Sequence, residues 1–256
     1  MSENSKIEWT DHTFNPWWGC TRVSEGCQHC YAETFARRFG VTWGPQAERR
    51  IASPDTWAKP LAWNRKAQRD GVRRRVFCAR MADVFEDRPE LNAPRIQLFN
   101  LMLETPWLDW LLLTKRPENI IEHVLYCAPG CRLPDNAWIG TTVENQAMAD
   151  KRIPELLKVP SRIRFLSCEP LLGPVNIEWH LTQRGDDGTP DHGIDWVICG
   201  GESGHGARPM NPDWARSLRD QCVYDYVPFF FKQFGGVNKK AAGRTLDGRT
   251  WDQFPE

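Results

Sequence analysis

The sequence has no net charge and no long apolar segment. Lysine plus arginine number 33, as do aspartate plus glutamate, so no global field attracts the chain to nucleic acid or to an anionic membrane. Nowhere are there about 18 consecutive apolar residues, and the start, MSENSKIEWTDHTFNPWWG, has no basic region followed by an apolar run. These absences argue against a membrane span and a secretory leader. We therefore expect a soluble, cytoplasmic protein without a membrane partner.

The nine cysteines do not form a disulfide framework by number or spacing. A chain of 256 residues that is 41% hydrophobic buries enough core to fold without disulfides. Nine is an odd number, and six of the cysteines are scattered. These six are Cys78, Cys127, Cys131, Cys168, Cys199 and Cys222. We expect Cys78, Cys168 and Cys199 to be small buried residues, because they lie within or beside apolar runs. Cys127 and Cys131, spaced C-x3-C, are a weak candidate for a metal-binding pair.

Short apolar runs alternate with longer amphipathic segments, and no internal repeat is present. That alternation predicts βα units around a parallel sheet. The expected strands are 75–82, 110–114, 137–142, 163–167, 195–199 and 228–232, and the expected helices are 88–104, 117–126, 145–157, 211–221 and one after Cys30. A closed eight-unit barrel needs about 250 residues for its units alone. We therefore predict one α/β domain over residues 1–256, a partial (β/α)6-7 barrel of the TIM-like type.

Polar residues follow each of the six expected strands. They are Asp83, Lys115 with Arg116, Glu144, Glu169, Glu202 with Ser203, and Lys232 with Gln233. The carboxyl edge of a parallel sheet is where ligands bind in such folds, so six polar strand ends in succession predict a site there. Gly200 and Gly201 in GGESGHG allow backbone to approach a ligand closely. This segment is not a phosphate-binding P-loop, because it lacks the lysine.

The strongest local motif is GCTRVSEGCQHCYAE, which spaces Cys20, Cys27 and Cys30 as C-x6-C-x2-C. A structural zinc site closes with four ligands, whereas a [4Fe-4S] cluster can keep one iron open for a cofactor or substrate. His29 or His12 could supply a fourth ligand. For His29 this is sterically awkward, because it lies directly beside Cys30. The motif favours an iron–sulfur cluster over zinc, and zinc over a loop without metal.

These motifs resemble known families. The cysteine loop is similar to that of radical S-adenosylmethionine enzymes, whose usual spacing, C-x3-C-x2-C, is three residues shorter. With LLLTKRPEN, GTTVEN, FLSCEPLLGP, ICGGESG and FFFKQFGG, it resembles a phage-associated, radical-SAM-like family of uncharacterised substrate along nearly the whole chain. The LLLTKRP segment is similar, more weakly, to the spore photoproduct lyase branch, which repairs a thymine dimer in DNA.

The resemblance implies an enzyme that generates a 5′-deoxyadenosyl radical from S-adenosyl-L-methionine. Cys20, Cys27 and Cys30 would hold the [4Fe-4S] cluster, the metal site. Four residues are implied to bind the cofactor. Asp83 would accept a hydrogen bond from the cofactor's amino group, and Glu144 would hydrogen-bond a hydroxyl of its ribose. Gly200 and Gly201 are the other two. The residues implied to be catalytic are Lys115, Glu169 and Glu202. Lys115, Arg116 and Lys232 could bind a carboxylate or phosphate, and structural ion pairs with the neighbouring acids are the alternative.

The expected partners are an external electron donor and a nucleic-acid-related or nucleotide substrate. The substrate expectation rests on the phage association, on 13 tryptophans that can stack on bases, and on basic clusters. These clusters are Arg49-Arg50, Arg73-Arg74-Arg75 and Lys239-Lys240. Two other functions fit the motif. One is a zinc-bearing nucleic-acid-binding module without catalysis. The other is an iron–sulfur electron carrier, which three cysteines without a second cluster motif disfavour.

Overall fold

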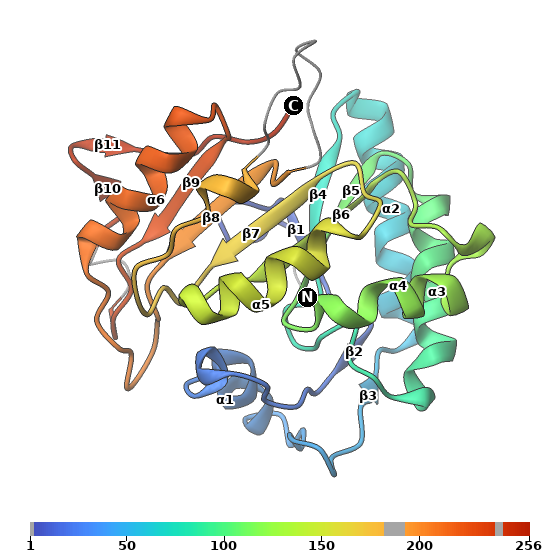
Figure 1. The fold of residues 1–256 in the computed structure, drawn as a ribbon. Coiled ribbons are helices and arrows are strands. Elements are labelled where there is room, and N and C mark those ends of the chain that lie inside the picture. The colour runs from blue at the N-terminus through green and yellow to red at the C-terminus, as the bar shows by residue number, and fades with distance from the viewer. Residues whose placement is uncertain (1–2, 182–192, 239–242) are drawn as a thin grey trace. The chain divides into compact units, whose positions relative to one another are not determined.

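The computed structural model describes residues 3–181, 193–238 and 243–256 (Figure 1). Seven strands form a sheet in the order β1-β4-β5-β6-β7-β8-β9. They are β1 (His12–Phe14), β4 (Arg74–Cys78), β5 (Leu108–Thr114), β6 (Ala137–Thr142), β7 (Arg164–Cys168), β8 (Trp196–Gly200) and β9 (Phe229–Gln233). The pairs β1–β4, β4–β5, β7–β8 and β8–β9 are parallel. This is the α/β fold class of a partial (β/α) barrel, as the sequence predicts.

Helices connect most of these strands. They are α1 (Tyr31–Arg37), α2 (Pro54–Asp70), α3 (Asn92–Glu104), α4 (Ile120–Cys127), α5 (Gln146–Leu157) and α6 (Pro212–Tyr224), with 3-10 turns at Glu25–Cys27, Pro89–Leu91, Pro117–Asn119, Pro129–Cys131 and Glu178–His180. The strands β2 (Trp17–Trp18) and β3 (Arg50–Ile51) form an antiparallel pair, as do β10 (Thr245–Leu246) and β11 (Arg249–Thr250). Within the described ranges, no helix combines the length and the apolar character needed to cross a membrane.

All six predicted strands are confirmed, and one of them is shorter than expected. The strand predicted to reach residue 82 ends at Cys78, because the chain then turns and the Ala82 amide donates to the carbonyl of Ala79. The four helices predicted between strands are confirmed as well, two of them opening with a 3-10 turn. The 17-residue helix α2 was missed. It has Pro54 in its first turn, ends at Asp70 and is capped by Gly71, which has a φ of 65°.

By internal contacts the chain divides into two compact units. The first contains Met1–Val23, Ala32–Ile139 and Val159–Arg162, and the second contains Ser24–Tyr31, Gly140–Lys158 and Ile163–Glu256. A single domain over the whole chain stays a prediction.

The core of the first unit lies between its strands and the helices α2, α3 and α4. Helix α3 packs against α4 on one side and contacts α2 (Figure 1). From α2, Trp57 meets Phe14 of β1 edge-on, with ring centroids 5.2 Å apart. Phe14 and Trp110 of β5 are fully buried. This apolar packing fixes the strand ends that carry Asp83 and Arg116.

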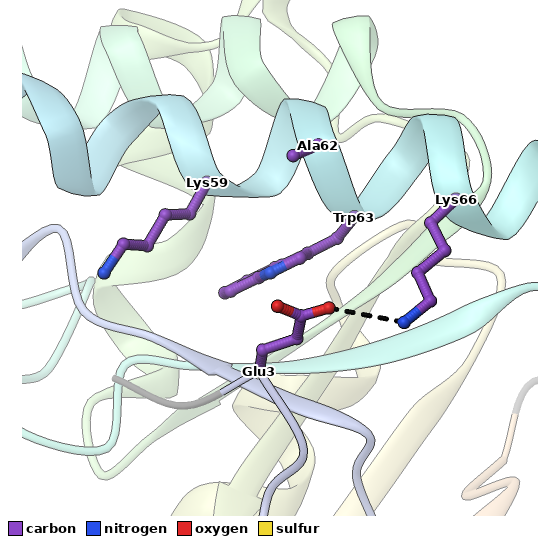
Figure 2. Close-up of a pocket in the computed structure, with 5 residues that line it drawn as sticks. All are labelled: Glu3, Lys59, Ala62, Trp63 and Lys66. Carbon is purple, nitrogen blue, oxygen red and sulfur yellow. Dashed lines mark hydrogen bonds and ion pairs between the residues drawn. The ribbon is translucent and has the colours of Figure 1, made fainter.

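A surface hollow of the first unit lies beside α2 and is lined by Glu3, Lys59, Ala62, Trp63 and Lys66 (Figure 2). The Lys66 ammonium donates to a Glu3 carboxylate oxygen at 3.4 Å. Trp63 also stacks on His12, with ring centroids 4.5 Å apart. Burial lowers the pKa of His12. His12, one of the possible fourth ligands, is therefore a buried neutral ring stacked on Trp63.

The second unit has its core around β7, β8 and β9, and α6 packs against β8 and β9 (Figure 1). Cys168 and Cys199 are register partners on β7 and β8, and both are fully buried. Cys78 of the first unit is fully buried as well. The expectation that these three cysteines are small core residues is confirmed.

Candidate functional site

The cysteine loop belongs to both units. Cys20 is in the first unit, whereas Cys27 and Cys30 are in the second, directly before α1. All three are half-buried, and none of the nine cysteines takes part in a disulfide. In the part of the chain that the structure describes, no three His, Cys, Asp or Glu side chains are grouped so as to hold a metal ion. The donor set itself, three soft thiols on one short loop, suits an iron–sulfur cluster.

In the first unit, Arg116 holds the start of the loop. Its side chain, only 9% exposed, follows β5. One terminal nitrogen, Nη2, donates to the carbonyl of Thr21 at 2.8 Å. The other, Nη1, donates to Asp83 Oδ2 at 2.8 Å and lies 3.8 Å from the sulfur of Cys20. The guanidinium thus links the end of β5 to Cys20 and its neighbour.

Asp83 is held in turn by the end of β5. Its Oδ1 accepts from the Thr114 hydroxyl at 2.7 Å and from the Phe85 amide at 3.0 Å, and its Oδ2 accepts from the Lys115 amide at 3.2 Å. The structure therefore joins Asp83 to the backbone of Lys115, another sequence-predicted residue. With the Arg116 ion pair, both oxygens of this buried carboxylate accept hydrogen bonds.

A second buried arginine, Arg49, fixes the same part of the loop. It forms a two-pronged ion pair with Glu86, with both N···O distances 2.8 Å. Its Nη2 also donates to the Thr21 hydroxyl at 3.0 Å. Gly19 has a φ of 114°, and a Cβ there would lie 2.9 Å from Arg49 Cδ, so both its conformation and its space favour glycine. Two buried guanidiniums thus hold the loop around Cys20.

Burial of the Cys20 thiol raises its pKa to about 12, Asp83 adds to the rise, and Arg116 opposes it. Burial by itself would lower the pKa of Arg116, but Asp83 and Cys20 hold it above its usual range. Cys20 is therefore a neutral thiol at pH 7 unless a metal displaces its proton.

In the second unit, Glu144 anchors the middle of the loop. Its carboxylate accepts from the Ser24 hydroxyl and from Arg152 Nη1, each at 2.6 Å. Glu144 is fully buried, and Arg152 also donates to the carbonyl of Thr142 at 2.8 Å. A Cβ on Gly26 would lie 2.3 Å from Glu144 Oε1. The loop therefore packs directly onto this carboxylate.

Glu202 and Arg208 hold the loop beside Cys27 and Cys30. Glu202 Oε2 accepts from the amide and Nε of Arg208, both at 2.9 Å, and its Oε1 accepts from Nη2 at 2.6 Å. The ring of His29 lies with Nδ1 3.1 Å from Glu202 Oε2. Arg208 also donates to Glu25 in the loop. Burial acts to raise the pKa of Glu202, but hydrogen bonds from Arg208 and His29 outweigh it and lower the value to about 2.

The last group lies at the ends of β7, β8 and β9. Glu169 and Lys232 form an ion pair. A Cβ on Gly200 would lie 3.5 Å from Lys232 Cβ and 3.6 Å from Glu169 Cδ, so this glycine borders the pair. A Cβ on Gly201 would lie 2.0 Å from the carbonyl oxygen of Phe234. Close approach to the backbone after β9 is therefore a sufficient structural reason for glycine at 201.

Comparisons with known proteins identify the family. A family model described as "Protein of unknown function (DUF5131)" matches residues 4–255. The chain belongs to this family. No curated protein matches the sequence. A solved structure of spore photoproduct lyase, a cysteine-to-serine mutant, matches with a TM-score of 0.50 and 12% identity, covering 86% of this chain and 63% of that chain.

The chain thus spans less than two thirds of that lyase, and at this identity the likeness shows a shared fold. The family match, like the resemblance predicted from the motifs, spans nearly the whole chain, and its description names no activity. Phage association of this DUF5131 chain stays a prediction.

The sequence found the acids of the site and two of the basic residues that pair with them, Arg116 and Lys232, but not the others. Asp83, Glu144 and Glu202 were singled out as strand-end residues, and each meets the cysteine loop or its anchors. The residues that were missed, or were not given a role at the loop, are Ser24, Arg49, Glu86, Arg152 and Arg208. A signal existed for Arg152, a charged residue beside Ile153 on the buried face of the amphipathic helix α5.

The features that suggested a nucleic-acid substrate are largely structural. Seven of the 13 tryptophans are buried, whereas Trp179 is 84% exposed. Arg49 is paired with Glu86, and Arg73 donates to Asp109 at 3.0 Å. Lys239 and Lys240 lie outside the described residues. In each described arginine cluster, at least one arginine is thus paired with an acidic residue.

Proposed function

We propose that this chain is a radical S-adenosylmethionine enzyme in which Cys20, Cys27 and Cys30 hold a [4Fe-4S] cluster. The observation that carries the proposal is a loop with three thiols to which buried charged side chains form hydrogen bonds at several points. The similarity of its fold to that of spore photoproduct lyase also supports the proposal. Three cysteine ligands leave one iron available to a cofactor.

When bound, the cluster and S-adenosyl-L-methionine supply the one-electron cleavage that yields a 5′-deoxyadenosyl radical. The chain's own residues position the ligands. Arg116 and Arg49 hold the loop at Thr21, and Glu144 holds it at Ser24. Because these anchors are buried and each is bonded to an oppositely charged side chain, they hold the loop before any cofactor arrives, which reduces the entropy cost of binding.

For the remaining residues we propose two roles. Lys115 and the half-buried ion pair of Glu169 with Lys232 lie at strand ends and are the candidates to contact the substrate. Glu144 and Glu202 act by positioning the cysteine loop, because both are buried and contact it at Ser24 and His29. Binding of the cofactor by Asp83, Gly200 and Gly201 and by a Glu144 contact to ribose stays a prediction from the sequence.

A nucleic-acid-related or nucleotide substrate and an external electron donor complete the proposal. The substrate part rests on the sequence resemblance and on the tryptophans that stay accessible, such as Trp179. The donor is required because the cleavage consumes one electron, which the cluster must receive from outside the chain.

A zinc-bearing module without catalysis is the second candidate, and one observation favours it. Metal-binding histidines usually donate their other ring nitrogen to a carboxylate. His29 has that arrangement, with Nδ1 beside Glu202 and Nε2 left for a metal. A zinc site of Cys20, Cys27, Cys30 and His29 would be closed and would not bind the cofactor.

Anaerobic reconstitution separates the two candidates. The protein is loaded with iron and sulfide, given dithionite and S-adenosyl-L-methionine, and assayed for 5′-deoxyadenosine. We expect a brown protein that forms this product, no product with Cys27→Ala, and unchanged product with the matched control Cys222→Ala, which removes a buried thiol outside the loop. A colourless protein with one tightly held zinc and no cofactor cleavage would establish the module instead.

A further inference from the structure

We propose that Arg116 raises the reduction potential of the cluster by donating a hydrogen bond to the sulfur of Cys20. Arg116 Nη1 lies 3.8 Å from this sulfur, within the range of an N–H···S contact. The inference rests on the proposed function, because the sulfur matters to a potential only when it is a cluster ligand.

The direction of this N–H group is fixed by the other contacts of the guanidinium. Nη2 donates to the Thr21 carbonyl, and Nη1 is shared between Asp83 and Cys20. Asp83 itself is held by Thr114 and by two backbone amides. Arg116 is buried, so it has little freedom to turn away from the sulfur. The donor is therefore held beside the sulfur by contacts within the chain itself.

The electrostatic effect follows from the charge that reduction adds. A reduced cluster carries one more negative charge than an oxidised one, and a buried cation stabilises that charge more strongly than an exposed cation does. Hydrogen bonds to ligand sulfurs are among the factors that set the potentials of iron–sulfur clusters. Arg116 supplies both the charge and the hydrogen bond, and each raises the potential.

Asp83 acts in the opposite direction. Its carboxylate, 2.8 Å from Arg116 Nη1, offsets the positive charge and competes for the same N–H group. Removing the Asp83 charge should therefore leave the Arg116 effect less opposed. Changes at Arg116 and at Asp83, which contact each other, should therefore shift the reduction potential in opposite directions. Loss of folding alone would not produce opposite shifts.

Arg49 provides the matched control. Like Arg116, it is a buried arginine that binds Thr21 and a carboxylate, here Glu86. Among the described residues, no hydrogen bond joins Arg49 to a cysteine sulfur. A change at Arg49 therefore perturbs the same loop without removing a donor to a ligand.

The test is anaerobic redox titration of the reconstituted protein, followed by the spectrum of the cluster, after iron and sulfide have been measured per chain. We expect the midpoint to fall in Arg116→Gln, to fall less in Arg116→Lys, which keeps the charge, and to rise in Asp83→Asn. We expect Arg49→Lys, which keeps a cation beside the loop, to shift the midpoint less than Arg116→Gln does.

Each outcome bears on one claim. A wild-type protein without iron and sulfide would end the proposed function, and this inference with it. A loaded wild-type protein with unchanged midpoints in Arg116→Gln and Asp83→Asn, or with both shifted in one direction, would overturn the inference alone. If Arg116→Gln does not load, Arg116→Lys and Asp83→Asn decide: opposite shifts support the inference, and unchanged midpoints overturn it.

Discussion

Ser24 Oγ donates a hydrogen bond of 2.6 Å to Oε1 of Glu144, a residue 120 positions further along the chain. The other carboxylate oxygen pairs with Arg152 at 2.6 Å, and both charged side chains are almost completely buried. The cysteine loop is thus tied to an ion pair inside the second unit. A buried pair contributes little net stability when complete but is costly to break.

Glu144→Gln should destabilise the protein by about 3 kcal/mol, because it leaves the charge of Arg152 buried and unpaired. Urea unfolding at pH 7 measures this. The matched control is Glu155→Gln on α5, the helix that carries Arg152, where Glu155 pairs with Lys158 at the surface and the expected loss is below about 1 kcal/mol. Equal losses in the two variants would contradict the role of the buried pair.

Gly26→Ala should destabilise the loop by about 1–3 kcal/mol, because its methyl group would overlap the Glu144 carboxylate. The same change should reduce the iron retained per chain after reconstitution. Gly173→Ala is the control, since its Cβ would make only an ordinary contact of 3.8 Å with Asn145 Cβ. Full iron content and wild-type stability in Gly26→Ala would show that the loop is not packed on Glu144.

Glu202 makes the stability of the second unit depend on pH. Hydrogen bonds from Arg208 lower its pKa from 4.5 to about 2 in the folded chain. The stabilisation is therefore complete above pH 4.5 and is lost as the pH falls towards 2. We expect the stability difference between the wild type and Glu202→Gln, measured by urea unfolding, to be larger at pH 6 than at pH 3. A difference that does not change with pH would refute this assignment.

Thiol labelling should separate the loop cysteines from the core cysteines. Burial raises the pKa of Cys78, Cys199 and Cys222, and that of Cys168 to about 12, so these thiols should not react in the native metal-free protein. Cys131 is exposed, and Cys27 and Cys30 are half-buried, so these three should react first. Mass-spectrometric mapping of a short maleimide pulse gives the order. Early labelling of Cys168 or Cys199 would contradict the packing of β7 against β8.

The strands were predictable because buried parallel strands are continuous apolar runs, and β6 was predicted to the residue. Helix α2 was not, because Pro60 lies inside it and proline usually interrupts a helix. Its buried residues, Trp57, Pro60, Trp63 and Ala67, nevertheless recur at helical spacing. In this segment the tertiary packing of two tryptophans outweighs the local preference.

The site was predictable only in part, because many of its contacts join residues that are far apart in the sequence. Cysteine spacing and acids at strand ends are local patterns that a sequence displays. The residue that meets each of them is not local, since Arg116 and Cys20 are 96 positions apart. Which arginine meets which carboxylate depends on packing, and so the anchors of the loop emerged only with the fold.

The central claim is that the three loop cysteines hold a cluster with an open iron. The most direct test is electron paramagnetic resonance of the reconstituted, reduced protein before and after addition of S-adenosyl-L-methionine, with iron and sulfide measured on the same sample. The account predicts about four iron and about four sulfide per chain, and a cluster signal that changes when the cofactor is added. Zinc in place of iron, or a cluster signal that the cofactor leaves unchanged, would contradict it.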